Sequence, residues 1–154
     1  MRGRTIVPRT RSTYHLRGNN YKSKYEKQIA TFLHSKHVKF VYEGEKISYA
    51  KPIANALCTE CGHAKIVQLR NYIPDFYIKK TGIYIETKGK FTSENRTKML
   101  DVIDSNPELD IRMLFQRDNW LSRKHATKYS EWCKQHGITY AIGTEVPLDW
   151  IGEE

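Results

Sequence analysis

Apolar residues recur along this 154-residue chain with two different spacings, one typical of helices and the other typical of strands. Within residues 21–35 they fall at i, i+4, i+7 and i+8, which places them on one stripe of a helix. A later helix has Thr92 or Ser93 as its N-cap, and another ends at Gly137, a residue typical of the position after a helix. We therefore predict helices over residues 21–35, 93–104 and 126–136.

Short apolar runs between turn residues predict six strands. The first two strands are joined by a turn at residues 43–45, and the next two by a turn that contains Gly82. Residues 51–71 show neither spacing, and we expect them to be irregular, while Trp150 and Ile151 are expected to pack the tail onto the body. This order of elements predicts a mixed α/β domain with a central β-sheet flanked by helices. The predicted strands are residues 38–42, 46–49, 74–78, 83–87, 111–115 and 138–142.

Charge is distributed unevenly along the chain and suggests a basic arm ahead of a folded domain. The net charge is +9, and residues 1–24 contain seven Lys and Arg residues and no acid. We predict a flexible basic arm over residues 1–19 and one folded domain over residues 20–154, with an insertion at 51–71 that contains cysteines. Such an arm suits a polyanionic partner, with nucleic acid favoured over a membrane, although a solvated terminus without a partner is the alternative.

The composition argues against several other classes of protein. Apolar residues make up 39% of the chain, which is enough for a packed core and argues against disorder. No apolar stretch approaches the roughly 18–20 residues that span a bilayer, and the N-terminal charges are not followed by the apolar run of a secretory signal. Three cysteines do not suggest a disulfide framework. We therefore expect a cytoplasmic protein with no membrane partner and no small-molecule substrate.

The fourth predicted strand ends in two charged residues of opposite sign. Strand alternation places Glu86 and Lys88 on the same side, and the preceding turn can bring Asp75 near Glu86. Mg²⁺ prefers oxygen ligands and keeps several waters, so a few carboxylates suffice to bind it, and the backbone carbonyl of Thr87 is a further candidate ligand. A metal held in this way beside a lysine suits phosphodiester hydrolysis. The alternative is an exposed ion pair between Glu86 and Lys88 with little energetic effect.

A further carboxylate lies on the first predicted helix. Ser23 and Glu26 have the spacing of a capping box, in which the side chain of Glu26 would bond back to the start of the helix. Glu26 also lies one position from the apolar stripe, so it can instead face the edge of the sheet and join Asp75 and Glu86. The sequence by itself leaves both interpretations open.

Several motifs resemble those of the PD-(D/E)xK nuclease superfamily. They are Pro74-Asp75, Glu86-Thr-Lys88 and Glu26 on the preceding helix. Within that superfamily the chain is similar to the phage endonuclease I family of Holliday-junction resolvases. The stretches "IPDF" and "ETKG" are the most specific elements, and "KHVKFVYEGEKISY", "NPELDIRMLF", "YSEWCKQHGI" and "VPLDWI" extend the resemblance to the C-terminus.

The resemblance implies a PD-(D/E)xK, restriction-endonuclease-like core and a structure-selective endonuclease, dependent on Mg²⁺ or Mn²⁺, that resolves four-way and branched DNA junctions. It implies a homodimer with exchanged chain segments, in which Glu26 of one subunit joins Asp75, Glu86 and Lys88 of the other. Asp75 and Glu86 would hold the metal, Glu26 would complete a second metal position, and Lys88 would act on the water or the phosphate. The alternatives are another nuclease of the superfamily, of the transposase-associated, restriction or repair type, and a zinc-containing DNA-binding module without catalysis.

The insertion at 51–71 departs from the family pattern, in which this link is shorter. It carries Cys58, Cys61 and His63 as candidate zinc ligands, and a C-x-x-C turn is half of a zinc site. Two such pairs that meet near the twofold axis of a dimer would give a site with four cysteines. A loop with two thiols and no metal is the alternative.

Basic residues around the acid cluster are predicted to contact DNA phosphates, although each of them is equally suited to be a solvated surface charge. The candidates are Arg11, Arg17, Lys90, Arg96, Lys98, Arg123 and Lys124.

Overall fold

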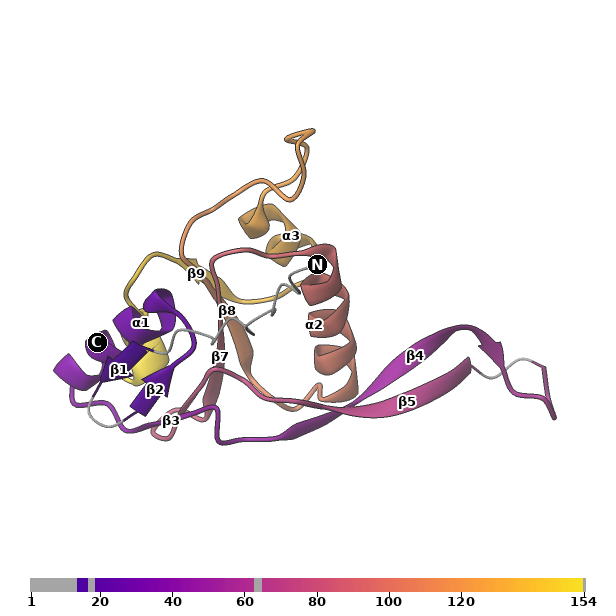
Figure 1. The fold of residues 1–154 in the computed structure, drawn as a ribbon, viewed down its shortest axis with the longest axis horizontal. Coiled ribbons are helices and arrows are strands. Elements are labelled where there is room, and N and C mark those ends of the chain that lie inside the picture. The colour runs from indigo at the N-terminus through magenta and orange to yellow at the C-terminus, as the bar shows by residue number, and fades with distance from the viewer. Residues whose placement is uncertain (1–13, 17–18, 63–64, 154) are drawn as a thin grey trace, which may run out of the picture.

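In the computed structural model, which describes residues 14–16, 19–62 and 65–153, a five-stranded sheet forms the centre of the molecule (Figure 1). Its strand order is β3-β6-β7-β8-β9. β6 runs antiparallel to both of its neighbours, β3 and β7, and β7, β8 and β9 run parallel. This mixed sheet confirms the predicted α/β class. The strands are β3 (Phe40–Tyr42), β6 (Phe76–Ile78), β7 (Ile83–Lys88), β8 (Ile111–Phe115) and β9 (Tyr140–Ile142).

Helices cover both faces of the central sheet. On one face α1 and the short 3₁₀ helix η1 pack around Ile85 and Leu114, and on the other α2 and α3 pack around Met113 and Phe115. Successive residues of β8 therefore enter opposite cores, as strand alternation requires. Trp150 and Ile151 are buried in the core on the α1 side, which confirms that they pack the tail onto the body. The helices are α1 (Lys24–Ser35), α2 (Ser93–Ser105), α3 (Tyr129–Gln135) and η1 (Leu148–Ile151).

Local capping explains where two of the helices begin. Ser23 caps α1 by accepting a hydrogen bond from the backbone N–H of Glu26, and Thr92 forms a capping box with Asn95 at the start of α2. The prediction for α2 is confirmed to within one residue. The predicted start of α1 at residue 21 is wrong because Tyr21 belongs to a strand and is fully buried. The prediction for α3 is three residues too long at its start.

A long antiparallel ribbon formed by β4 and β5 extends from the body (Figure 1). The expectation that residues 51–71 are irregular is therefore wrong. Only the base of the ribbon, at Ile47, Tyr49 and Tyr72, is buried, and beyond it most side chains of both strands are exposed. No apolar alternation marks strands that lack a buried face, so the periodicity could not show them. The two strands are β4 (Ile47–Leu57) and β5 (Lys65–Tyr72).

The turn at residues 43–45 does not join two paired strands, which corrects the predicted first hairpin. β3 pairs with β6, and β4 pairs with β5. Phe40 packs edge-on against Phe76 of β6, with 5.5 Å between the ring centroids, and both belong to the core on the α1 side. The partner of β3 is therefore decided by contacts between distant segments rather than by the nearby turn.

A small hairpin stands at the N-terminal end of the described chain. β1 (Tyr14–Leu16) pairs antiparallel with β2 (Asn19–Tyr21). β1 falls within residues 1–19, for which we predict a flexible arm, so regular structure begins earlier than predicted. Residues 1–13 lie outside the described residues. Among the helices of the described segments, none is long and apolar enough to cross a membrane.

Candidate active site

Two carboxylates lie side by side where the hairpin of β6 and β7 opens. The antiparallel register pairs Phe76 with Ile85, and continuing it by one residue sets Asp75 opposite Glu86. Glu86 lies within β7, and Asp75 directly precedes β6. The structure thus brings together the two acids that the sequence analysis placed on neighbouring strands.

Glu86 is buried, with only 5% of its surface exposed, and both of its carboxylate oxygens are hydrogen-bonded. Oε1 accepts from Nζ of Lys88 at 2.5 Å, and Oε2 accepts from the hydroxyl of Tyr72 at 2.6 Å. A buried carboxylate requires such partners because it has lost its hydration. Glu86 and Lys88 are therefore not the exposed surface ion pair of the alternative interpretation.

Asp75 experiences an excess of negative charge. The backbone N–H and the hydroxyl of Thr87 both donate to Oδ2 of Asp75 at 2.7 Å. Even so, burial and the negative charge of Glu86 raise the pKa of Asp75 to about 8, against the lowering effects of Lys88 and Thr87. One ammonium group does not balance two carboxylates in this setting, and a divalent cation would.

Lys88 retains its proton in this site. Burial by itself lowers the pKa of Lys88, but the negative charges of Glu86 and Asp75 and the hydrogen bond to Glu86 outweigh burial and raise it above the ordinary value. Lys88 is therefore suited to donate hydrogen bonds to an oxyanion and is poorly suited to accept a proton.

Glu26 reaches the same site from α1. Its Oε1 accepts from the hydroxyl of Ser23 at 2.7 Å, and its Oε2 accepts from the hydroxyl of Tyr42 at 2.5 Å. Glu26 thus accepts from the side chain of Ser23, whereas a capping box uses the backbone N–H of the N-cap residue. Glu26, Thr87 and Lys88 line one cavity of about 560 Å³. A single chain places Glu26 there, and the exchange of segments between two subunits stays a prediction.

The donor set of the site fits a hard divalent cation such as Mg²⁺ or Mn²⁺. Asp75 and Glu86 offer carboxylate oxygens, and the raised pKa of Asp75 reflects the charge that such a cation would neutralise. In the part of the chain that the structure describes, no three His, Cys, Asp or Glu side chains are gathered as a metal site. Mg²⁺ keeps several waters and is held by one or two carboxylates, so the pair is sufficient. The Thr87 carbonyl stays a predicted ligand.

Two tyrosines of the site were not found by the sequence analysis. Tyr72 at the end of β5 donates to Glu86, and Tyr42 at the end of β3 donates to Glu26. Tyr72 is fully buried, and burial together with the charge of Glu86 raises the pKa of its hydroxyl well above the ordinary value. Both residues lie outside the acidic motifs, and each looks like an ordinary apolar strand residue in the sequence.

The predicted DNA-binding residues occupy different settings. Lys90, Arg123 and Lys124 are exposed, whereas Arg96 donates to the carbonyl of Phe91 at 2.8 Å. Lys98 lies over the ring of Tyr72, with 5.1 Å from its Nζ to the centroid, and so contacts a residue of the site. Arg11 and Arg17 lie outside the described residues. The role of all seven in binding DNA stays a prediction.

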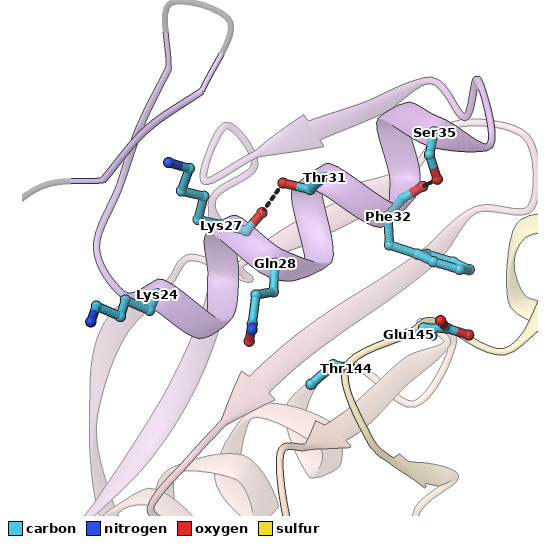
Figure 2. Close-up of a pocket in the computed structure, with 8 residues that line it drawn as sticks. All are labelled: Lys24, Lys27, Gln28, Thr31, Phe32, Ser35, Thr144 and Glu145. Carbon is cyan, nitrogen blue, oxygen red and sulfur yellow. Dashed lines mark hydrogen bonds between the residues drawn. The ribbon is translucent and has the colours of Figure 1, made fainter.

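A second cavity, of about 590 Å³, lies along α1 (Figure 2). Lys24, Lys27, Gln28 and Thr31 line it from the helix, and Glu145 lies on the opposite wall. Lys24 also lines the cavity that contains Glu26 and Lys88, so the two cavities adjoin. A surface with lysine and hydroxyl donors therefore leads away from the site along the helix.

The candidate zinc residues lie far along the ribbon and not at the acid cluster. Cys58 and Cys61 belong to the turn after β4, where Cys61 is exposed, and His63 lies outside the described residues. Zinc binding by these residues stays a prediction.

The fold and the site together define an α/β protein whose central sheet carries a carboxylate–lysine centre suited to phosphodiester hydrolysis. Residues 9–154 match the family model described as Phage endonuclease I. The chain is 35% identical to Endonuclease I of Escherichia phage T7 over 134 residues, which cover 86% of this chain and 79% of that protein. It is 37% identical to Endodeoxyribonuclease 1 of Enterobacteria phage T3 over 125 residues, or 80% and 72% of the two chains. The chain belongs to the phage endonuclease I family, which confirms the resemblance and the endonuclease class.

Proposed function

We propose that this protein is a DNA endonuclease, dependent on Mg²⁺ or Mn²⁺, that resolves four-way and branched DNA junctions in the cytoplasm of a phage-infected cell. The observation that carries the proposal is the ion pair of Glu86 and Lys88 next to Asp75, which accepts from Thr87 between them, in a site that Glu26 approaches from α1. The names of the two phage relatives, an endonuclease and an endodeoxyribonuclease, support DNA as the substrate.

The site residues have separate tasks in the cleavage of a phosphodiester. A metal ion held by Asp75 and Glu86 would polarise the attacking water and neutralise charge on the phosphoryl oxygens. Lys88 keeps its proton and donates hydrogen bonds to the phosphate as negative charge develops. The oxygen of the water forms a bond to phosphorus as the water releases a proton to the solvent. The bond from phosphorus to the leaving sugar oxygen breaks, and that oxygen takes up a proton from the solvent. Glu26 would help to hold a second metal ion, as the resemblance to the family implies.

The DNA strand on one side of the scissile phosphate follows α1. Lys24 stands between the site cavity and the cavity in Figure 2, and Lys27 lies one helical turn further on. Ammonium groups spaced along a helix are suited to contact successive phosphates, and such contacts position the DNA without reading its sequence. Contacts of this kind agree with a nuclease that selects its substrate by shape.

A symmetric dimer accounts for the cutting of junctions. A four-way junction has paired strands of the same polarity, and two identical sites related by a twofold axis would cut one strand each. The proposal therefore includes a homodimer, with or without exchange of the segment that carries Glu26.

The experiment that tests the site measures cleavage and binding of a synthetic four-way junction by Asp75→Asn and Glu86→Ala variants. Both variants should lose cleavage by a factor of about 10³ or more, as expected when a metal ligand is removed, and should still bind the junction in Ca²⁺. Asp104→Asn, which changes an exposed carboxylate at the end of α2, is the matched control and should cut like the parent protein. Cleavage by either site variant at the parent rate would remove the assignment.

The substrate preference is tested by competition. The junction and a linear duplex of the same sequence are offered together in Mg²⁺, and the junction should be cut at least tenfold faster. Equal rates on the two substrates would be consistent with a nuclease but would contradict a preference for junctions.

A further inference from the structure

The loop between β8 and α3, residues 116–128, carries an exposed tryptophan. Figure 1 shows this loop projecting from the body beyond α3. Trp132 and Trp150 are buried, whereas 40% of the surface of Trp120 is exposed. Tryptophan is enriched at interfaces because it combines a large apolar ring with a polar N–H group. The groups around Trp120 indicate which kind of partner it suits.

Two basic side chains of the loop lie against the ring of Trp120. The imidazole of His125 stacks on it, with 5.2 Å between the ring centroids and 21° between the planes. Nζ of Lys128 lies 5.1 Å from the centroid of the ring. The negative face of an indole ring attracts a cation, so the ring stabilises the position of the ammonium group. Trp120 therefore orders a lysine and a histidine at the surface of the loop.

The backbone of the loop is also ordered. Trp120 and Lys128 form an antiparallel bridge, and the N–H of Leu121 donates to the carbonyl of Thr127 at 2.8 Å. These contacts close the two ends of the loop onto each other. A loop that is ordered before its partner binds loses less conformational entropy on binding.

The loop has an excess of positive charge. Its single acid, Asp118, accepts from the backbone N–H and the hydroxyl of Ser130 at 3.0 and 2.7 Å, so its carboxylate is directed to α3. Within the described chain none of the basic residues of the loop is paired with a carboxylate. Unpaired positive charges around aromatic rings suit a nucleic acid, which offers phosphates and flat bases. The lysines and arginines of the loop are Arg117, Arg123, Lys124 and Lys128.

The loop begins at the wall of the candidate active site. Gln116, its first residue, lines the same cavity as Glu26 and Lys88. The N–H of Gln116 donates to the carbonyl of Lys88 at 3.1 Å, which fixes the start of the loop beside β7. Residues of α1 line this cavity too. A DNA strand that follows α1 into the site can therefore leave it along the loop.

We propose that residues 116–128 form a second DNA-contacting element, which binds the strand on the side of the scissile phosphate away from α1. Arg123, Lys124 and Lys128 contact phosphates of this strand. Trp120 is a positioning residue, which orders Lys128 and His125 for the contact and becomes covered by the DNA. The inference rests on the proposed nuclease function, since it requires DNA in the site.

Fluorescence of the full chain tests whether DNA covers Trp120. Acrylamide should quench the exposed Trp120 of the free protein, and a four-way junction added in Ca²⁺ should lower the quenching constant toward that of Trp120→Phe. Trp120→Phe is the matched control, because it keeps a ring for the cation and removes the exposed fluorophore. It should bind the junction nearly as tightly as the parent protein, and DNA should barely change its quenching, since the two remaining tryptophans are buried.

The salt dependence of junction binding in Ca²⁺ tests the phosphate contacts. Replacing Arg123 and Lys124 together by alanine changes two exposed residues, and the slope of log K against log salt should become shallower by about 2. Trp120→Ala should weaken binding and make the slope shallower by up to about 1, because Lys128 loses its support. The alanine double variant at Lys36 and Lys39, which line a cavity elsewhere, is the control and should keep the parent slope.

Two results would overturn the inference: quenching of Trp120 that the junction does not change, or the parent salt slope in the variant at Arg123 and Lys124. Protection of Trp120 that rises with protein concentration without DNA would also overturn it, and would assign the loop to a contact between copies of the chain. A parent protein that bound no DNA would contradict both the inference and the nuclease function. A parent protein that bound and cut junctions, with either of the first two results, would contradict the inference alone.

Discussion

Tyrosine hydroxyl groups hold two of the three acids of the site in place. The hydroxyl of Tyr72 donates to Glu86 at 2.6 Å, and that of Tyr42 donates to Glu26 at 2.5 Å. Each acid thereby has one oxygen engaged by a neutral donor that leaves its charge intact. A carboxylate with a set orientation meets a metal ion or water without reorganisation, and catalysis benefits from such preorganisation.

Removal of the Tyr72 hydroxyl tests this positioning role. In Tyr72→Phe one oxygen of buried Glu86 is left without its partner, which costs about 1–3 kcal/mol. We expect kcat to fall about tenfold, with a smaller change in KM, and the Mg²⁺ concentration for half-maximal rate to rise. Single-turnover cleavage over a series of Mg²⁺ concentrations measures the rate of the chemical step and its metal dependence, and steady-state cleavage measures kcat and KM. Tyr77→Phe, whose ring packs on Tyr84 at 4.7 Å between centroids, is the matched control. If Tyr72→Phe lowered the stability but left the metal dependence unchanged, Tyr72 would have a structural role and would not position Glu86 for metal binding.

The raised pKa of Asp75 predicts how stability depends on pH without metal. The unfolded chain releases this proton near pH 3.8, and the folded protein keeps it until about pH 8, so the folded state binds the extra proton within that window. Stability should therefore fall as pH rises through the window. Asp75→Asn should raise the melting temperature by on the order of 5 °C at pH 8.5, and by much less at pH 5.

Thermal unfolding in a chelating buffer measures this effect. Added Mg²⁺ should stabilise the parent protein at pH 8.5, because it binds the folded state, and should stabilise Asp75→Asn less. A variant that melts below the parent protein at both pH values would contradict the charge imbalance inferred for Asp75.

At the scale of elements, β7 contributes residues both to the hydrophobic core and to the site, because alternate residues of the strand point to opposite faces of the sheet. Ile83 and Ile85 enter the core on the α1 side. Strand alternation sends Glu86 and Lys88 to the opposite side, where Tyr72 and Lys98 of α2 lie. The sequence predicted this strand and its two charged residues because the alternation lies within six consecutive residues. The ribbon of β4 and β5 escaped prediction because most of its side chains are exposed, so its strands show no apolar alternation.

The cavity along α1 predicts a contribution of that helix to DNA affinity. Replacing Lys24 and Lys27 together by alanine removes two ammonium groups that line it. Binding should weaken, and the slope of log K against log salt should become shallower by about 2, because each phosphate contact contributes about 0.9. Junction binding in Ca²⁺ over a salt series measures the slope. Lys36 and Lys39, which line a different cavity, supply the control pair. If the two double variants had the same salt slope, the lysines of α1 would not contact the DNA phosphates.

At the scale of the whole molecule, the charge is concentrated at the N-terminus. Seven of the basic residues lie within residues 1–24, which have no acid, so the remainder of the chain carries little net charge. Such a distribution favours a role in affinity rather than in chemistry, since long-range attraction requires no defined geometry.

Deletion of residues 1–18 tests the role of the arm. The deletion removes five arginines, so junction binding should weaken, and the salt slope should become shallower by up to about 4–5. The cleavage rate at saturating protein should change little, because the acid cluster lies outside the deleted segment. A salt slope equal to that of the full chain would show that the arm makes no phosphate contacts.

The sequence by itself determined most of the elements with a buried face, the α/β class, the family and the acidic motif. Each of these depends on residues close together in the chain, or on a pattern that a single strand or helix displays. Only the tertiary structure decided that β3 pairs with β6, that residues 51–71 form most of a ribbon, and that Tyr72 and Tyr42 hold Glu86 and Glu26. It also placed Glu26 beside Lys88 in one chain. The ribbon has strands with no buried face, and the other features arise from contacts between different segments of the chain. Local periodicity carries no information about either.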